Sequence, residues 1–160
     1  MAIRPFAKED IAPLKEILLA TQVFRAEEIE VAIELMEIVI EEPHQEDYVM
    51  MTSVDESHVV QGYYCVGPTP MTVSSYDLYW LAVDPKRYGS GVSRELLAHC
   101  ESHVREHRGT KIIAETSSLP MYARTHAFYL KHGYQEEARI KDYYSAGDDL
   151  VIFTKQLKEA

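Results

Sequence analysis

The segment of the sequence best suited to chemistry is a glycine-containing turn, Asp84-Pro85-Lys86-Arg87-Tyr88-Gly89-Ser90-Gly91-Val92-Ser93, which joins an extended run to an amphipathic helix. Glycines let the backbone of such a loop approach a ligand closely. The first amides of a helix have no partner within the helix, and with the positive end of the helix dipole they form an anion site suited to a pyrophosphate. We therefore predict phosphate binding by the backbone amides of residues 89–93, with a charge-assisted hydrogen bond from Arg87.

This turn departs from two common phosphate-binding motifs. It lacks the Gly-Lys-Ser/Thr of a P-loop, and the third glycine of a dinucleotide-binding turn is not filled. A glycine pair before a helix can also be no more than a tight turn. A ligand assignment therefore needs a wider sequence pattern.

The wider pattern resembles motif A of the GNAT superfamily of acetyltransferases, which is Gln/Arg-x-x-Gly-x-Gly/Ala followed by paired leucines. With Leu96-Leu97 setting the register, Tyr88 occupies the Gln/Arg position, Gly91 the central glycine and Ser93 the Gly/Ala position. An alternative register, Lys86-x-x-Gly89-x-Gly91, matches the letters better but puts the leucine pair on the wrong turn of the helix. We use the first register, in which two of the three signature positions depart from the family pattern.

A second segment, residues 123–134, resembles motif B of the same superfamily, which commonly ends Phe-Tyr-x-x-x-Gly-Phe. Phe128-Tyr129 followed by Gly133-Tyr134 matches that ending, and Tyr122 stands where the family often has an asparagine that bonds the cofactor. Ile3-Arg4-Pro5 with Glu9-Asp10 also resembles the family's first strand and helix. The resemblance covers nearly the whole chain.

The resemblance implies an enzyme that moves an acetyl group from acetyl-CoA, its co-substrate, to a primary amine by direct attack in a ternary complex, without a metal. The general acid would be Tyr129, whose phenol has an ordinary pKa of about 10 and can protonate a departing thiolate of pKa about 8.5. A backbone N–H of the preceding strand would stabilise the oxyanion, and a bulge there typically splays that strand from the next one. The implied cofactor-binding residues are Leu81, Ala82, Val83, Arg87, Tyr88, Gly89, Ser90, Gly91, Val92, Ser93, Tyr122 and Tyr129.

Two carboxylates are candidates for the base that takes a proton from the amine. Asp77 lies where histone-type relatives keep a glutamate, and Glu115 lies where ribosomal-protein N-terminal acetyltransferases keep theirs. We favour Glu115, although a chain of water molecules could replace both. On the acceptor side, Tyr143 and Tyr144 resemble the peptide-gripping hairpin of N-terminal protein acetyltransferases, but aromatic residues are also ordinary in hairpins.

Other polar residues near these motifs have two interpretations each. Asp148 and Asp149 could hold a cationic group or only form a turn, and Thr116 and Ser117 could bond the pantetheine amides or only cap the backbone. The acidic face of the helix at 26–42 could be a solvated surface or a wall beside an amine site. The spaced histidines lack a third ligand, so we expect no metal site.

The elements that must position these residues follow the order β-α-α-β-β-β-α-β-α-β-β, which implies an α/β fold with a mixed sheet and helices on its faces. Periodicity predicts a helix around residues 11–18 and further helices at 26–42, at 91–106 and from Pro120 to Gly133. Gly109 and Gly133 are the expected stops of the last two helices. Strands are expected at 2–5, 46–53, 57–66, 76–83, 110–116, 134–143 and 149–156.

The composition, 46% hydrophobic and 26% charged over 160 residues, fits one globular domain that spans 1–160. Sixteen basic and 26 acidic residues give a net charge of −10, which argues against nucleic-acid binding and fits a cationic substrate. No apolar stretch approaches the roughly 20 residues of a membrane span, and a signal-peptide core is lacking, so we expect a cytoplasmic protein. Cys65 and Cys100 are expected to be buried free thiols.

The acceptor remains open at this level: a small amine, an amino acid, a polyamine, an antibiotic or a protein N-terminus. The alternative function is a non-catalytic acyl-CoA-binding sensor of the same fold. Tyr129 and the two carboxylates argue against a sensor, which needs neither an acid nor a base. A homodimer is common in this fold, but no segment of the sequence predicts one.

Overall fold

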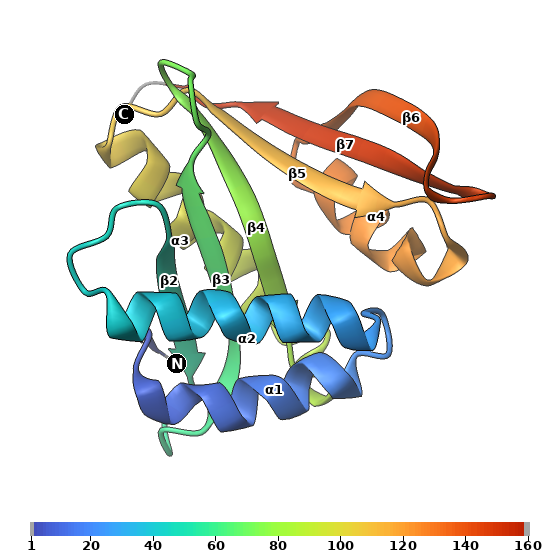
Figure 1. The fold of residues 1–160 in the computed structure, drawn as a ribbon. Helices are drawn as coiled ribbons and strands as arrows, with labels where there is room; N and C mark the ends of the chain where they lie inside the picture. Colours follow the sequence, from blue (N-terminus) through green and yellow to red (C-terminus); the bar gives the residue numbers. More distant parts are fainter. Residues whose placement is uncertain (1, 159–160) are drawn as a thin grey trace.

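The computed structural model describes residues 2–158 and pairs seven strands into one sheet of order β1-β2-β3-β4-β5-β7-β6 (Figure 1). All neighbours are antiparallel except β4 and β5, which are parallel and connected through α3. The predicted mixed α/β fold and its element order are confirmed. The strands are β1 (Ala2–Pro5), β2 (Val49–Val54), β3 (Val60–Pro68), β4 (Ser75–Val83), β5 (Lys111–Ser117), β6 (Gln135–Ser145) and β7 (Asp148–Gln156).

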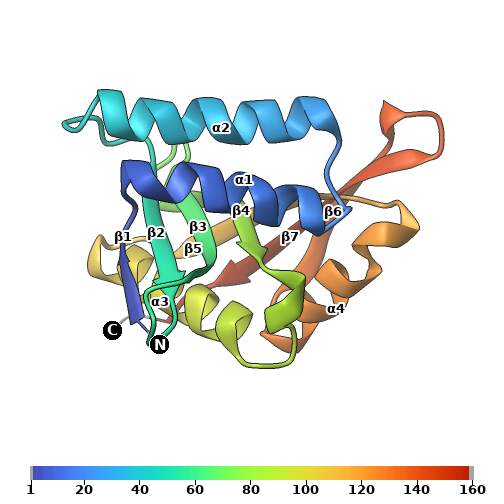
Figure 2. The same cartoon turned by 90° about the horizontal axis from the view of Figure 1, so that it is seen from below.

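Four helices cover the two faces of the sheet, with α1 and α2 on one side and α3 and α4 on the other (Figure 2). They are α1 (Ile11–Ala20), α2 (Ala26–Glu41), α3 (Val92–Glu106) and α4 (Ala123–Lys131), with short 3₁₀ turns at Lys8–Asp10, Pro85–Arg87 and Pro120–Tyr122. Among the described residues, no helix is both long and apolar enough to cross a membrane.

Strand β3 shows how the sequence builds two cores, because its side chains are buried on both faces of the sheet. Tyr63 and Cys65 pack against the α1 and α2 side, whereas Tyr64 and Val66 pack against the α3 side. Burying an aliphatic side chain such as that of Val66 contributes about 2 kcal/mol. Cys65 and Cys100 are both fully buried and lie in different cores, as expected for two structural thiols.

Two boundaries differ from the sequence prediction for identifiable reasons. Strand β3 begins at Val60 instead of residue 57, because the Asp55 carboxylate accepts hydrogen bonds from the amides of Ser57 (2.8 Å) and Val59 (3.0 Å) and extends the turn. The residue with left-handed backbone after α3 is Arg108 (φ 64°), so Gly109 is not the helix stop that we expected. Gly109 is needed for space, since a Cβ there would lie 2.3 Å from Val104 Cγ1.

A partly buried ion pair fixes the start of α1 on the sheet. The Arg4 guanidinium donates to both oxygens of Asp10, each at 2.8 Å, and Asp10 also accepts from the Ala7 amide and the Thr52 hydroxyl, each at 2.9 Å. Burial alone would raise the pKa of the Asp10 carboxyl, but these hydrogen bonds outweigh it and hold the pKa below its ordinary value of 3.8.

Candidate active site

The site is built on a gap in the sheet between β4 and β5. These strands pair only at Ser75↔Lys111, Tyr76↔Ile112 and Asp77↔Ile113, and then diverge (Figure 1). The register of β4 against β3 also shifts, so that Tyr79 is an extra residue in a β-bulge. The bulge is predicted by the family resemblance. From Leu78 to Val83, the backbone groups of β4 that point away from β3 therefore face the gap.

The N-terminus of α3 opens at the β4 side of this gap. Gly89 (φ 82°) and Gly91 (φ 93°) take left-handed backbone conformations that other residues adopt at a cost. The first hydrogen bond that enters the helix runs from the Glu95 amide to the Gly91 carbonyl at 3.0 Å. The amides of Val92, Ser93 and Arg94 precede that bond and are oriented to bind an anion.

A cavity of about 380 Å³ lies beside this helix end. We call it the cationic cavity, after its lining residues Arg87, Arg94, Arg124 and Lys131. It brings together most of the predicted cofactor-binding residues, namely Leu81, Ala82, Val83, Arg87, Tyr88, Gly89, Gly91, Val92, Ser93 and Tyr129. Its positive lining contrasts with the net −10 of the chain and has the sign that suits an anionic ligand.

Two predicted residues have partners of their own at this cavity. Arg87 donates to the Asp55 carboxylate at 2.8 Å, which fixes its side chain and offsets part of its charge. Ser90 is not among the lining residues, and its hydroxyl donates to the Arg87 carbonyl. The Arg124 guanidinium lies over the ring of Tyr88 and ties α4 to the turn.

A second cavity, of about 420 Å³, lies between α2, the open end of β5 and the β6–β7 hairpin. We call it the acidic cavity, after its lining carboxylates Glu28, Glu115 and Asp148. Within residues 2–158 its one lining cation is Arg25, which donates to Glu28 at 2.9 Å and is thereby engaged. Tyr144 lines this cavity, whereas Tyr143 is 55% exposed and lies outside it. Tyr122, which the motif aligns with a cofactor ligand, also lines the acidic cavity and not the cationic one.

The two cavities meet at a shared set of residues, Val23, Phe24, Leu81, Thr125 and Tyr129. Tyr129 is 5% exposed and its ring packs against Phe128, Tyr134 and Phe153. Burial raises the pKa of the Tyr129 phenol, so the group stays protonated at neutral pH and can act as a donor.

The two candidate bases occupy different places. Glu115 lines the acidic cavity, and burial, followed by the negative charge of Asp77, raises the pKa of its carboxyl above 4.5. Asp77 lines neither cavity and lies where β4 and β5 are still paired. Burial also raises the pKa of Asp77. The geometry therefore places Glu115, but not Asp77, in the lining of the acidic cavity.

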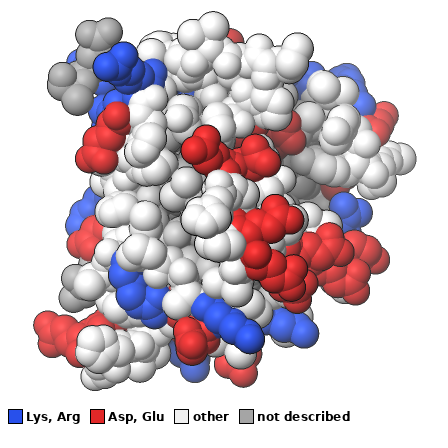
Figure 3. Space-filling model, turned by 60° about the vertical axis from the view of Figure 1, so that its left-hand side comes forward, with Lys and Arg blue, Asp and Glu red and all other residues white. Residues whose placement is uncertain are grey.

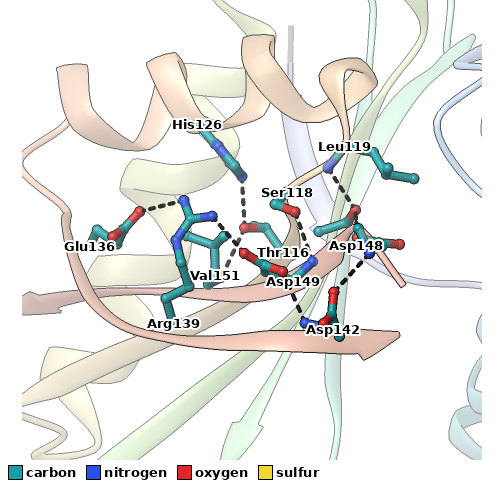
Figure 4. A network of polar contacts seen from close by, with 12 residues as sticks. Thr116, Ser118, Leu119, His126, Glu136, Arg139, Asp142, Asp148, Asp149 and Val151 are labelled. Carbon is teal, nitrogen blue, oxygen red and sulfur yellow. Dashed lines mark hydrogen bonds and ion pairs between the residues drawn. The ribbon is translucent and has the colours of Figure 1, made fainter. Parts of the chain in front are cut away.

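A polar network fastens the β6–β7 hairpin to the end of β5 (Figure 4). The Asp149 amide donates to the Ser118 hydroxyl at 2.7 Å, and the Ser118 amide donates to the Asp149 carbonyl at 3.0 Å. The Thr116 hydroxyl donates to the Val151 carbonyl at 2.8 Å, and the Ser117 hydroxyl donates to Asp148. Both hydroxyls that we considered for pantetheine therefore have partners inside the protein.

Sequence reasoning overlooked several lining residues. We did not single out Arg94, Arg124 and Lys131. Arg124 lies one helical turn before Phe128, so a projection of the α4 sequence would have placed both residues on the same side of the helix. Of the acidic face of α2, Glu28 lines the acidic cavity, while Glu27, Glu30, Glu34, Glu37 and Glu41 are exposed. Figure 3 shows acidic side chains gathered over the side where α2 lies. Most of that face is therefore solvated surface, and Glu28 is the one of these six carboxylates that lines a cavity.

Comparison with known proteins agrees with this geometry. A family model described as an acetyltransferase (GNAT) domain matches residues 31–136. A Desulfovibrio desulfuricans protein of the GNAT family is 37% identical and superimposes with a TM-score of 0.87 over 97% of this chain and 98% of that one. No curated protein sequence matches the chain.

Two more distant structures share the fold. The aminoglycoside 6'-N-acetyltransferase from Enterococcus faecium is 16% identical, with a TM-score of 0.75 over 100% of this chain and 99% of that one. The acetyltransferase YncA from Salmonella typhimurium, solved with acetyl-CoA, is 21% identical, with a TM-score of 0.76 over 100% and 95% of the two chains. The family match over most of the chain and the identity to the Desulfovibrio protein establish that this chain belongs to the GNAT family of acetyltransferases.

Proposed function

We propose that the protein transfers the acetyl group of acetyl-CoA to a primary amine by direct attack in a ternary complex. The observation that carries this proposal is the meeting of two cavities of opposite charge at Tyr129 and Leu81. One cavity suits the phosphates of acetyl-CoA and the other suits a protonated amine. A site for one ligand alone would need only one of them.

The cationic cavity would bind acetyl-CoA. The free amides at the start of α3 and the side chains of Arg94, Arg124 and Lys131 would bind its phosphates. The acyl end would then extend toward the junction of the cavities, between β4 and β5. The complex of the Salmonella relative with acetyl-CoA supports this use of the fold.

The chemistry follows from the groups at the junction. Glu115 would accept a proton from the ammonium form of the acceptor, and the free amine would attack the thioester carbonyl carbon. A backbone amide among Leu81, Ala82 and Val83 would stabilise the oxyanion. As the C–S bond breaks, Tyr129 would donate its proton to the departing CoA thiolate, and the nitrogen would release its second proton to solvent, from which Tyr129 regains one. The products are an N-acetyl amine and free CoA.

The test measures CoA release from acetyl-CoA with a panel of amines, amino acids and N-terminal peptides. Because Cys65 and Cys100 are both fully buried, a thiol-reactive dye will report released CoA and not the thiols of the folded protein. Tyr129→Phe should lower turnover at least tenfold, which corresponds to about 1.4 kcal/mol of barrier.

Tyr76→Phe is the matched control, because Tyr76 packs against the same core and lines neither cavity. It should leave turnover unchanged. Binding of acetyl-CoA without turnover on any acceptor would instead favour an acyl-CoA-binding sensor.

A further inference from the structure

The acidic cavity contains more negative charge than the protein itself compensates. Arg25 is its only lining cation among the described residues, and Arg25 pairs with Glu28 at 2.9 Å. Glu115 and Asp148 form no ion pair within residues 2–158. Asp148 is buried and Glu115 is exposed at the mouth of the same cavity, and two negative charges without a cationic partner favour a ligand that provides positive charge.

Asp148 is the more informative of the two carboxylates. It is 6% exposed, and its Oδ1 accepts a hydrogen bond from the Ser117 hydroxyl. Its Oδ2 accepts no hydrogen bond from any described residue, although Asp148 lines the cavity. This oxygen is therefore available to accept a hydrogen bond from a donor on a ligand in the cavity.

The position of Asp148 is fixed by the hairpin. It follows the turn at Gly147, where β6 and β7 pair through Ser145↔Asp148. Its neighbour Asp149 bonds to Ser118 on both its amide and its carbonyl, which anchors the start of β7 to the end of β5 (Figure 4). The carboxylate is therefore held rigidly, as a binding residue should be.

Aromatic rings surround these carboxylates. Tyr122 and Tyr144 line the cavity with Trp80, and aromatic faces attract cations. Burial, and after it the negative charge of Glu115, raises the pKa of Tyr144 to about 12, and Asp148 adds to the shift. Tyr144, Glu115 and Asp148 all line this one cavity.

We propose that the acidic cavity selects acceptors with a second cationic group, which Asp148 binds while the reacting amine lies near Glu115. The acceptor class is then a polyamine or an amino sugar with two or more ammonium groups, in preference to a monoamine or a peptide N-terminus. This rests on the proposed acetyl transfer, because the reacting amine is assigned from it. An amino acid would be disfavoured, since its own carboxylate would be repelled by Glu115 and Asp148.

The test measures equilibrium binding by calorimetry to the CoA-bound protein, with spermidine and butylamine as probes. Spermidine should bind at least tenfold more tightly than butylamine. Asp148→Asn removes the charge but can still accept the Ser117 hydrogen bond, and it should weaken spermidine binding at least fivefold with little effect on butylamine. Equal affinities of the two amines for the unmodified protein would overturn the proposal without any variant.

Asp149→Asn is the matched control. It removes the same charge from the next residue, whose carboxylate pairs with Arg139 at 3.0 Å and does not line the cavity. A similar loss in both variants would show a general charge effect and would overturn the role of Asp148. Turnover is measured in parallel: selective binding without acetylation would support the cation site and contradict the proposed transfer.

Discussion

The guanidinium carbon of Arg124 lies 3.9 Å from the centre of the Tyr88 ring, so that α4 touches the turn before α3 along the wall of the cationic cavity. Arg124→Ala removes a cation and the contact that orders the Tyr88 ring. We expect the KM for acetyl-CoA to rise about tenfold with little change in kcat, because both groups act on binding. Lys15→Ala, which removes an exposed charge on α1, should leave the KM unchanged. A fall in kcat at unaltered KM would contradict this assignment.

Gly91 combines a left-handed conformation with the start of α3, and a Cβ there would lie 3.0 Å from the Arg94 guanidinium. Gly91→Ala should cost about 1 kcal/mol of stability through backbone strain and should also weaken acetyl-CoA binding. Gly147→Ala is matched, because Gly147 has a similar φ of 81° and no atom near its Cβ position, but it lies in the hairpin turn. Thermal melts and binding titrations should show similar destabilisation and a binding defect in Gly91→Ala alone.

The pH dependence of kcat/KM can separate the two candidate bases. The pKa of Glu115 is raised, so activity should fall as the pH drops through a value above 4.5 and the carboxylate becomes protonated. Glu115→Gln should lower kcat/KM about 100-fold and remove that acid limb. Asp77→Asn should keep the limb but move it to lower pH, because the negative charge of Asp77 helps to raise the pKa of Glu115. Loss of the limb in Asp77→Asn alone would make Asp77 the base.

The Arg4–Asp10 pair predicts how stability depends on pH. Asp10→Asn should lower the free energy of unfolding by about 2 kcal/mol near neutral pH, since charged hydrogen bonds are lost while solvent screens the partly exposed Arg4 that remains. The folded-state pKa of Asp10 is lowered, so its contribution is complete above the unfolded pKa of about 3.9 and is lost as the pH falls through the folded value. Urea titrations should show the two proteins converging below about pH 4.

Glu9→Gln is the control for that measurement, because Glu9 is exposed beside Asp10. Its unfolding free energy should stay close to that of the unmodified protein at every pH. A difference between Asp10→Asn and the unmodified protein that grows at low pH would contradict the sign of the shift.

Most of the fold could be predicted from local sequence. Tyr63, Tyr64 and Cys65 alternate between two cores, and the sequence indicates this burial on both faces by an apolar run without polar residues. The glycine turn before α3 is equally recognisable by its composition. The predicted boundaries were wrong where a side chain binds backbone amides that would otherwise pair in a strand, as the Asp55 carboxylate does before the start of β3.

The lining of the two cavities was harder to predict, because it depends on distant segments that meet only after folding. Arg94 and Arg124 come from different helices, and Glu28 reaches Asp148's cavity from the other end of the chain. The periodicity of hydrophobic residues within one segment does not predict which distant segments come together around a cavity. The burial of Asp148 was equally hard to predict, since it depends on how β7 packs beside Ser117.

The three residue pairs between β4 and β5 also have a mechanical meaning. The sheet consists of two smaller sheets, β1–β4 and β5–β7, which are joined by these three residue pairs and by the packing of α3. A molecule bound in the cationic cavity would contact β4 and α3 on one side and α4, which follows β5, on the other, and so would connect the two smaller sheets. Saturation at 100 times its Kd would add about 2.7 kcal/mol to the unfolding free energy. A ligand in this cavity would thus stabilise the fold at the place where the polypeptide itself provides the fewest strand contacts.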